Sequence, residues 1–87
     1  MGNRDIEDVL NMHIQEEVYS SYLYLSMAAY CHSINLNGFA HWMRTQSNEE
    51  MKHAMKLYDY VVQRGWRVLL EEIKKPPHDF KSVADMM

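Results

Sequence analysis

The 87-residue chain contains one cysteine, three glycines and two prolines, and it has no long run of apolar residues. With Cys31 as its single cysteine it cannot form an internal disulfide, which fits a reducing compartment. No window reaches the roughly 20 apolar residues of a membrane span, and the first residues do not resemble a signal peptide. We therefore expect a cytoplasmic protein without a membrane partner.

An excess of basic residues is also lacking. Nine Lys and Arg residues stand against twelve Asp and Glu residues, a net charge of −3, so nucleic acid is not an expected partner. Apolar residues make up 47% of the chain and charged residues 24%, a globular composition. A chain this short builds only a small core alone, and a partner chain is a common remedy.

Two segments have the periodicity of amphipathic helices, and neither has glycine or proline in its interior. The first covers about residues 5–33, and its expected inward face carries Leu10, Glu17, Tyr24 and Cys31, with Ile6, His13, Ser20 and Met27 on the interleaved position. The second covers about residues 39–64, and its expected inward row is Phe39, Met43, Gln46, Glu50, His53, Leu57 and Tyr60.

The segments between and after these helices predict turns. Residues 33–38 contain two asparagines and a glycine and suit the loop of an antiparallel helical hairpin, while Gly65 can end the second helix. In residues 66–87, positions 68–75 have helical composition, and Pro76 and Pro77 stop any helix before them. A further helix can begin near residue 80, capped by Asp79 or Ser82.

The predicted fold is all-α. Two helices with wide apolar faces cannot bury them against each other alone, and a second copy supplies the missing helices. We expect an antiparallel two-helix hairpin that dimerises into a four-helix bundle.

Three polar residues interrupt the apolar faces near the middle of the predicted helices: Glu17 on the first, and Glu50 and His53 on the second. A buried carboxylate requires a cation or a proton, and Glu-x-x-His places an oxygen and a nitrogen ligand on adjacent turns. An antiparallel hairpin brings the three together, and two copies give four carboxylates and two imidazoles, the ligand set of di-iron carboxylate bundles. Such ligands suit Fe, Mn or Zn. A lone Glu-x-x-His is usually a solvated pair, but the match with Glu17 favours metal.

At these residues the chain resembles the ferritin family. The similarity covers the N-terminal half of a ferritin subunit, its first two helices, and the motifs occur in family order in residues 15–28, 39–44, 48–54, 73–76 and 80–82. The resemblance implies one half-ferritin domain over residues 1–87, with residues 66–87 as a mostly extended crossover. It also implies ferroxidase activity, in which Fe(II) is oxidised to Fe(III) by oxygen, with iron storage as a wider role.

The resemblance further implies a role for each site residue. Glu17 and His53 match terminal metal ligands, and Glu50 matches a bridging ligand. Tyr24 matches a tyrosine beside the centre, where it can hydrogen-bond a ligand or give up an electron, although a core role is equally open. Glu49 matches a residue that helps to bind a third iron, although a solvated carboxylate is the simpler interpretation.

The third and fourth ferritin helices are missing, so the resemblance implies that two chains complete the site. The expected cofactor is a di-iron pair, two ions per homodimer, within a possible larger homo-oligomer, and haem is not expected. Two alternatives stay open: a non-catalytic structural module that holds Zn or another divalent ion, and a truncated ferritin fragment.

Overall fold

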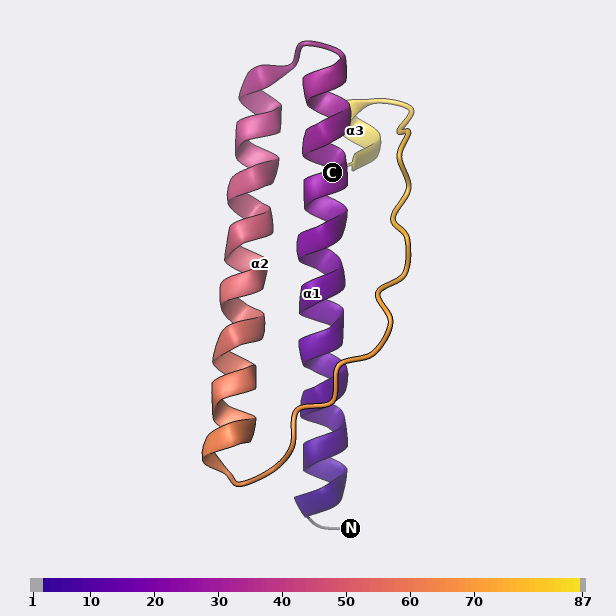
Figure 1. Cartoon of the computed structure of the whole chain (residues 1–87). Helices are drawn as coiled ribbons and strands as arrows, with labels where there is room; N and C mark the ends of the chain where they lie inside the picture. The colour runs from indigo at the N-terminus through magenta and orange to yellow at the C-terminus, as the bar shows by residue number, and fades with distance from the viewer. Residues whose placement is uncertain (1–2, 87) are drawn as a thin grey trace.

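Two long helices lie side by side in the computed structural model, which describes residues 3–86 (Figure 1). Helix α1 spans Asn3–Ser33, helix α2 spans Asn37–Gln63, and the short helix α3 spans Val83–Met86. The described residues contain no strand, so the all-α fold class is confirmed. Within this part of the chain, neither long helix has an apolar stretch that could cross a membrane.

Both long helices end in the same hydrogen-bonded turn. At the end of α1 the Leu36 N–H donates to the Cys31 carbonyl (2.8 Å) and the Asn35 N–H donates to the His32 carbonyl (3.2 Å). This pattern is a Schellman motif, and it needs the left-handed conformation that Asn35 adopts at φ 62°. At the end of α2, Gly65 takes the equivalent position at φ 77°.

The hairpin loop is shorter than the sequence predicts. Asn37 and Gly38 belong to the first turn of α2, whose first intrahelical bond runs from the Ala40 N–H to the Leu36 carbonyl at 2.9 Å. The turn-forming preference of Asn and Gly is compatible with the first residues of a helix, where backbone N–H groups have no intrahelical acceptor. The predicted start at residue 39 was therefore two residues late.

The two helices meet along a seam of small side chains. Ser21 and Ala28 of α1 and Ala40, Ser47 and Ala54 of α2 are buried, together with the larger Ile14, Met43 and Val61. The predicted inward face was partly wrong, because Ile6 and the side chain of His13 are 50% and 55% exposed. Two packed helices contact each other along one narrow line. Ile6 and His13 lie to the side of this line on α1 and are therefore exposed.

The core is densest at the loop end of the hairpin. Met27, Ala28, Cys31, Ala40 and Met43 form one buried cluster, which Met86 of α3 completes. Phe80 packs edge-to-face on Tyr30, with ring centroids 5.6 Å apart. The predicted cap of this last helix is present, since the Asp85 N–H donates to the Ser82 hydroxyl at 3.2 Å.

Residues 66–82, called the tail below, run extended along α1 in the direction opposite to α2 (Figure 1). The helical composition of residues 68–75 therefore does not produce a helix, and the chain is extended there. Side chains at four-residue spacing on α1 bind every second tail residue, because four helical residues rise about 6 Å and two extended residues about 6.6 Å. The tail N–H groups of Arg67, Leu69 and Glu71 donate to the side chains of Glu7 (2.9 Å), Asn11 (2.7 Å) and Gln15 (3.1 Å), respectively.

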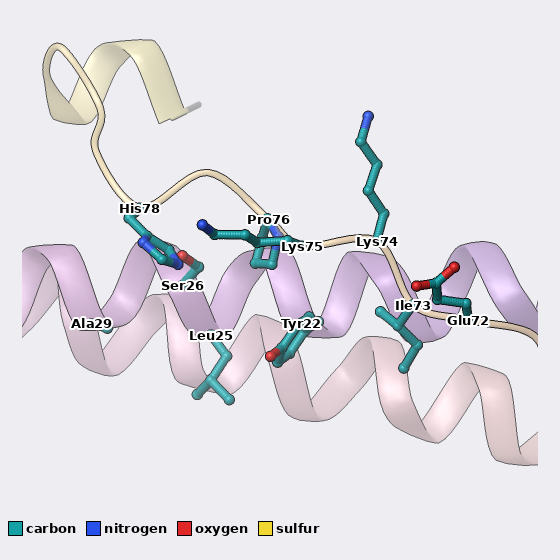
Figure 2. A pocket seen from close by; sticks show the side chains of 10 residues that line it. All are labelled: Tyr22, Leu25, Ser26, Ala29, Glu72, Ile73, Lys74, Lys75, Pro76 and His78. Atoms are coloured by element: carbon teal, nitrogen blue, oxygen red, sulfur yellow. The ribbon is translucent and has the colours of Figure 1, made fainter.

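Further along the tail, the Ser26 hydroxyl donates to the Pro77 carbonyl at 2.5 Å. Between α1 and this part of the tail lies a groove of about 680 Å³ (Figure 2). Its lining includes Tyr22, Leu25, Ser26, Ile73, Lys75 and His78. We call the side of α1 that lines this groove the tail side.

Candidate metal centre

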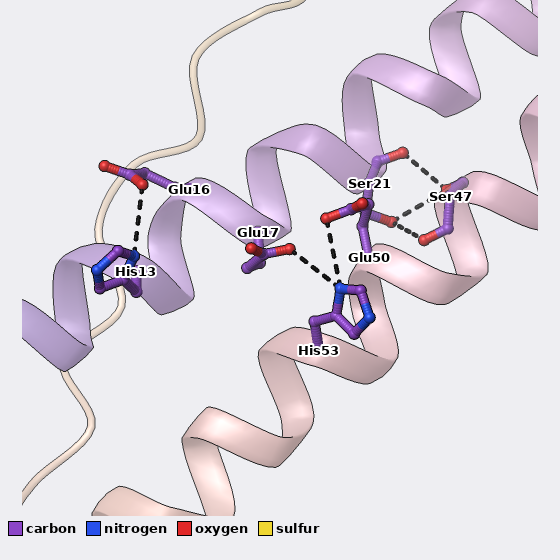
Figure 3. Close-up of polar contacts among 7 residues, drawn as sticks. All are labelled: His13, Glu16, Glu17, Ser21, Ser47, Glu50 and His53. Atoms are coloured by element: carbon purple, nitrogen blue, oxygen red, sulfur yellow. Dashed lines mark hydrogen bonds and ion pairs between the residues drawn. The ribbon is translucent and has the colours of Figure 1, made fainter.

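Glu17, Glu50 and His53 come together near the middle of the hairpin (Figure 3). Each offers a ligand atom within 4.8 Å of the other two. His53 Nδ1 lies 3.6 Å from Glu17 Oε2 and 3.8 Å from Glu50 Oε2. Glu50 and His53 are three residues apart on α2, so they project from adjacent turns, and the antiparallel helix brings Glu17 to them.

The cluster is partly open to solvent. The side chain of His53 is 51% exposed, whereas those of Glu17 and Glu50 are 29% and 22% exposed. Glu17 Oε2 is itself buried and has no hydrogen-bond partner. A buried carboxylate oxygen without a hydrogen bond loses its hydration, and the imidazole of His53 at 3.6 Å replaces it only in part. The residues therefore fit a cation, which would supply the missing interaction at Glu17.

The electrostatics of the three side chains also favour a bound cation. Protonated Glu50 can donate a hydrogen bond to the Glu17 carboxylate, which raises the pKa of Glu50; burial and the negative charge of Glu17 raise it further, while His53 acts in the opposite direction. Without a cation, the negative charge of Glu17 opposes the ionisation of Glu50. A bound divalent ion would reverse this effect and hold both in the charged form.

Comparison with known proteins assigns the chain to a family. The family model described as "Ferritin-like domain" matches residues 7–87. The chain belongs to the ferritin-like family. The resemblance found in the sequence is thereby confirmed.

Individual relatives of this ferritin-like chain share a substantial part of its sequence. The bacterial non-heme ferritin of Staphylococcus epidermidis is 34% identical over 85 residues, which cover 98% of this chain and 51% of the relative. The middle-subunit ferritin of Salmo salar is 43% identical over 79 residues, covering 88% and 45%. The open pore ferritin of Archaeoglobus fulgidus superposes with a TM-score of 0.95 at 45% identity, covering 99% and 53%. The chain thus spans about half the length of the relatives it matches.

Two predicted site residues of the ferritin-like chain lie outside the three-residue cluster. Glu49 is exposed and pairs with Lys52, whose Nζ lies 3.4 Å from Glu49 Oε1. Tyr24 is half-buried and meets Trp42 edge-to-face, with centroids 6.4 Å apart. The roles of both residues stay predictions.

Sequence reasoning missed two residues beside the centre, Ser21 and Ser47. They are buried and hydrogen-bonded to each other across the two helices (Figure 3). The inward face was assigned to Ser20 instead. The available signal was the row of small residues at seven-residue spacing, formed by Ser21 and Ala28 on one helix and by Ala40, Ser47 and Ala54 on the other.

Proposed function

We propose that two copies of the chain form one site that binds two iron ions and oxidises Fe(II) to Fe(III) with oxygen, with iron storage as the wider role. The observation that carries the proposal is the buried Oε2 of Glu17, which has no hydrogen-bond partner and lies next to His53 and Glu50. Membership of the ferritin-like family supports the choice of iron.

A second copy is proposed because one hairpin leaves the site and its surroundings uncovered. Ile6, Phe39 and Tyr60 are large apolar residues, 50%, 45% and 45% exposed. Ile6 precedes Glu17 by eleven residues and Phe39 precedes Glu50 by eleven, close to three helical turns, so they share the ligands' faces. Tyr60 follows His53 by seven residues, close to two helical turns, so it lies on the same face of α2 as His53. Another hairpin packed over this face would bury these side chains and bring a second ligand set.

In the proposed dimer, each chain contributes the same three ligands. Glu17 and His53 of each chain would hold one ion, and the Glu50 side chains of both chains would be shared between the two ions. Oxidation of Fe(II) to Fe(III) releases one electron per ion, which oxygen accepts. The four carboxylates favour the more highly charged product, since hard oxygen ligands stabilise a more positive ion.

Tyr24 is assigned a supporting role. It lies one heptad from Glu17 and can hydrogen-bond a ligand or donate an electron from a position beside the ions. Glu49, with its side chain 48% exposed, is assigned at most a further, weaker iron contact.

The test is a titration of the metal-free protein with Fe(II) in the absence of oxygen, followed by admission of oxygen. The wild type is expected to bind two ions per dimer and to consume oxygen, whereas Glu50→Ala should lose paired binding because symmetry removes two ligands at once. Glu16→Ala is the matched control, because Glu16 is exposed and contacts His13 rather than the cluster.

Three results would count against the proposal. The first is binding of far fewer than two ions per wild-type dimer, and the second is oxidation at the wild-type rate by Glu50→Ala. The third is tight metal binding without oxygen consumption, which would favour the non-catalytic module that holds Zn or another divalent ion.

A further inference from the structure

Ser21 and Ser47 form a reciprocal hydrogen-bonded pair at the seam of the hairpin (Figure 3). The Ser21 hydroxyl donates to the Ser47 carbonyl at 2.8 Å, and the Ser47 hydroxyl donates to the Ser21 carbonyl at 2.7 Å. The two hydroxyl oxygens are 3.0 Å apart. Each side chain is only 6% exposed, so water does not replace these bonds readily. Both hydroxyl hydrogens are therefore committed to the opposite helix.

The pair lies one turn from the ligands on each helix. Ser21 follows Glu17 by four residues, and Ser47 precedes Glu50 by three. The axial register of α1 against α2 decides how far Glu17 lies from the two ligands on the other helix. A slide of one residue, about 1.5 Å, would move Glu17 relative to His53 and lengthen both serine bonds together.

We propose that Ser21 and Ser47 are positioning residues, which fix the axial register at which Glu17 meets Glu50 and His53 and so preorganise the metal site. The inference rests on the function proposed above, because it concerns the same site. The carbonyls accept the hydroxyls with a lone pair that the helical N–H bonds leave free.

A purely structural role makes a different prediction. If the serines matter only because they are small, alanine serves equally well in the seam, where Ala28, Ala40 and Ala54 are already buried. Replacement of both serines by alanine leaves no polar group unpaired, since the two carbonyls keep their helical partners, and the protein should still fold. The effect of the double replacement on metal binding therefore distinguishes the positioning role from a purely structural role.

The experiment compares Co(II) binding, followed by its visible absorption, in the wild-type chain, the two single variants and Ser21→Ala/Ser47→Ala. We expect the double variant to lose about 10-fold or more in Co(II) affinity, comparable to the loss of a group that orients a metal ligand, and to show an altered spectrum. Each single variant retains one bond between a hydroxyl and the opposite carbonyl. The double loss should therefore exceed the product of the single losses.

Ser26→Ala is the matched control. It removes a hydroxyl-to-carbonyl bond from the same helix, but that bond ties the tail at Pro77 and lies away from the ligands. It should leave the affinity and the spectrum of Co(II) unchanged even where it lowers the melting temperature.

The outcomes are distinguishable. Wild-type affinity and spectrum in the double variant would overturn the positioning role and leave the proposed function standing. Failure of the wild type to bind Co(II) would overturn both. If the double variant does not fold, the single variants decide, and values equal to those of Ser26→Ala in both would overturn the inference.

Discussion

At the scale of single residues, the arrangement of Glu17 and Glu50 lowers the stability of the metal-free fold and favours the binding of a cation. Glu17 Oε2 is buried without a hydrogen bond, and the pKa of Glu50 is raised by the hydrogen bond that its protonated form can give to the Glu17 carboxylate and, next, by burial. Both features cost stability in the metal-free chain, and both become favourable when a cation arrives. The three side chains are thus better suited to a bound cation than to the metal-free state.

The first prediction concerns Glu50 without metal. Because the pKa of Glu50 is raised in the folded state, its stabilising contribution is fully present below the ordinary Glu value of about 4.3 and is lost as pH rises through the raised value. Glutamine cannot ionise, so Glu50→Gln should melt at a higher temperature than the wild type at neutral pH, with the gap closing in acid. Thermal unfolding with a chelator measures this gap, and Glu16→Gln should show none. An equal difference in melting temperature between Glu50→Gln and the wild type at neutral and at acid pH would contradict the reasoning.

The second prediction concerns Tyr24. Removal of its hydroxyl should leave Fe(II) binding without oxygen unchanged, because the three ligands remain, but should slow oxidation by about 10-fold. Stopped-flow absorbance after the addition of oxygen would measure this rate for Tyr24→Phe. Tyr30→Phe, which alters a tyrosine packed on Phe80, is the control. Equal rates in all three proteins would assign Tyr24 to the core alone.

At the scale of elements, sequence periodicity was sufficient to place both long helices and to bring Glu17 to Glu50 and His53. Periodicity could not choose the contact line, because a wide apolar face has several rows and the seam uses the one with Ser21 and Ser47. It also could not decide residues 68–75, whose composition favours a helix. Their extended form depends on side chains such as Asn11 and Gln15, which are distant in sequence.

The third prediction tests that tail contact. Gln15 Nε2 donates to the Glu71 and Glu72 carbonyls (3.2 and 3.1 Å), and Asn11 Nδ2 donates to the Arg67 carbonyl (3.0 Å). Asn11→Ala/Gln15→Ala should release this part of the tail at a cost of about 1 kcal/mol per residue, with the helices intact. Trypsin should then cleave faster after Arg67 and Lys74. The Ser26→Ala variant should keep the Arg67 site protected, and unchanged cleavage in the double variant would show that other contacts hold the tail.

At the scale of the whole molecule, the hairpin is long and thin. Its Cα radius of gyration is 15.4 Å and its extents are 49 × 18 × 18 Å. A compact domain of this length would have a radius of about 12 Å. An elongated pair of helices exposes much apolar surface, including Ile6, Phe39 and Tyr60 on the faces of the ligands. In the function proposed above, another hairpin across the site would both cover this apolar surface and complete the ligand set.

The last prediction is that the chain is a dimer through the face that carries Glu17, Glu50 and His53. Ile6 of α1 lies on this face and is 50% exposed, while Leu25 of the same helix is 48% exposed and lines the groove on the tail side. Ile6→Glu would place an unpaired carboxylate in the interface, at a cost on the order of a few kcal/mol, whereas Leu25→Glu would leave it in solvent.

Sedimentation across a wide concentration range should therefore show a wild-type dimer at micromolar concentration, a monomer for Ile6→Glu and a dimer for Leu25→Glu. Paired Fe(II) binding should follow the dimer, being lost in Ile6→Glu and kept in Leu25→Glu. A compact, folded wild-type monomer at micromolar concentration would contradict the shared site. Dissociation by Leu25→Glu but not by Ile6→Glu would place the interface on the tail side, and the ligands of two chains would then be too far apart to hold one pair of ions.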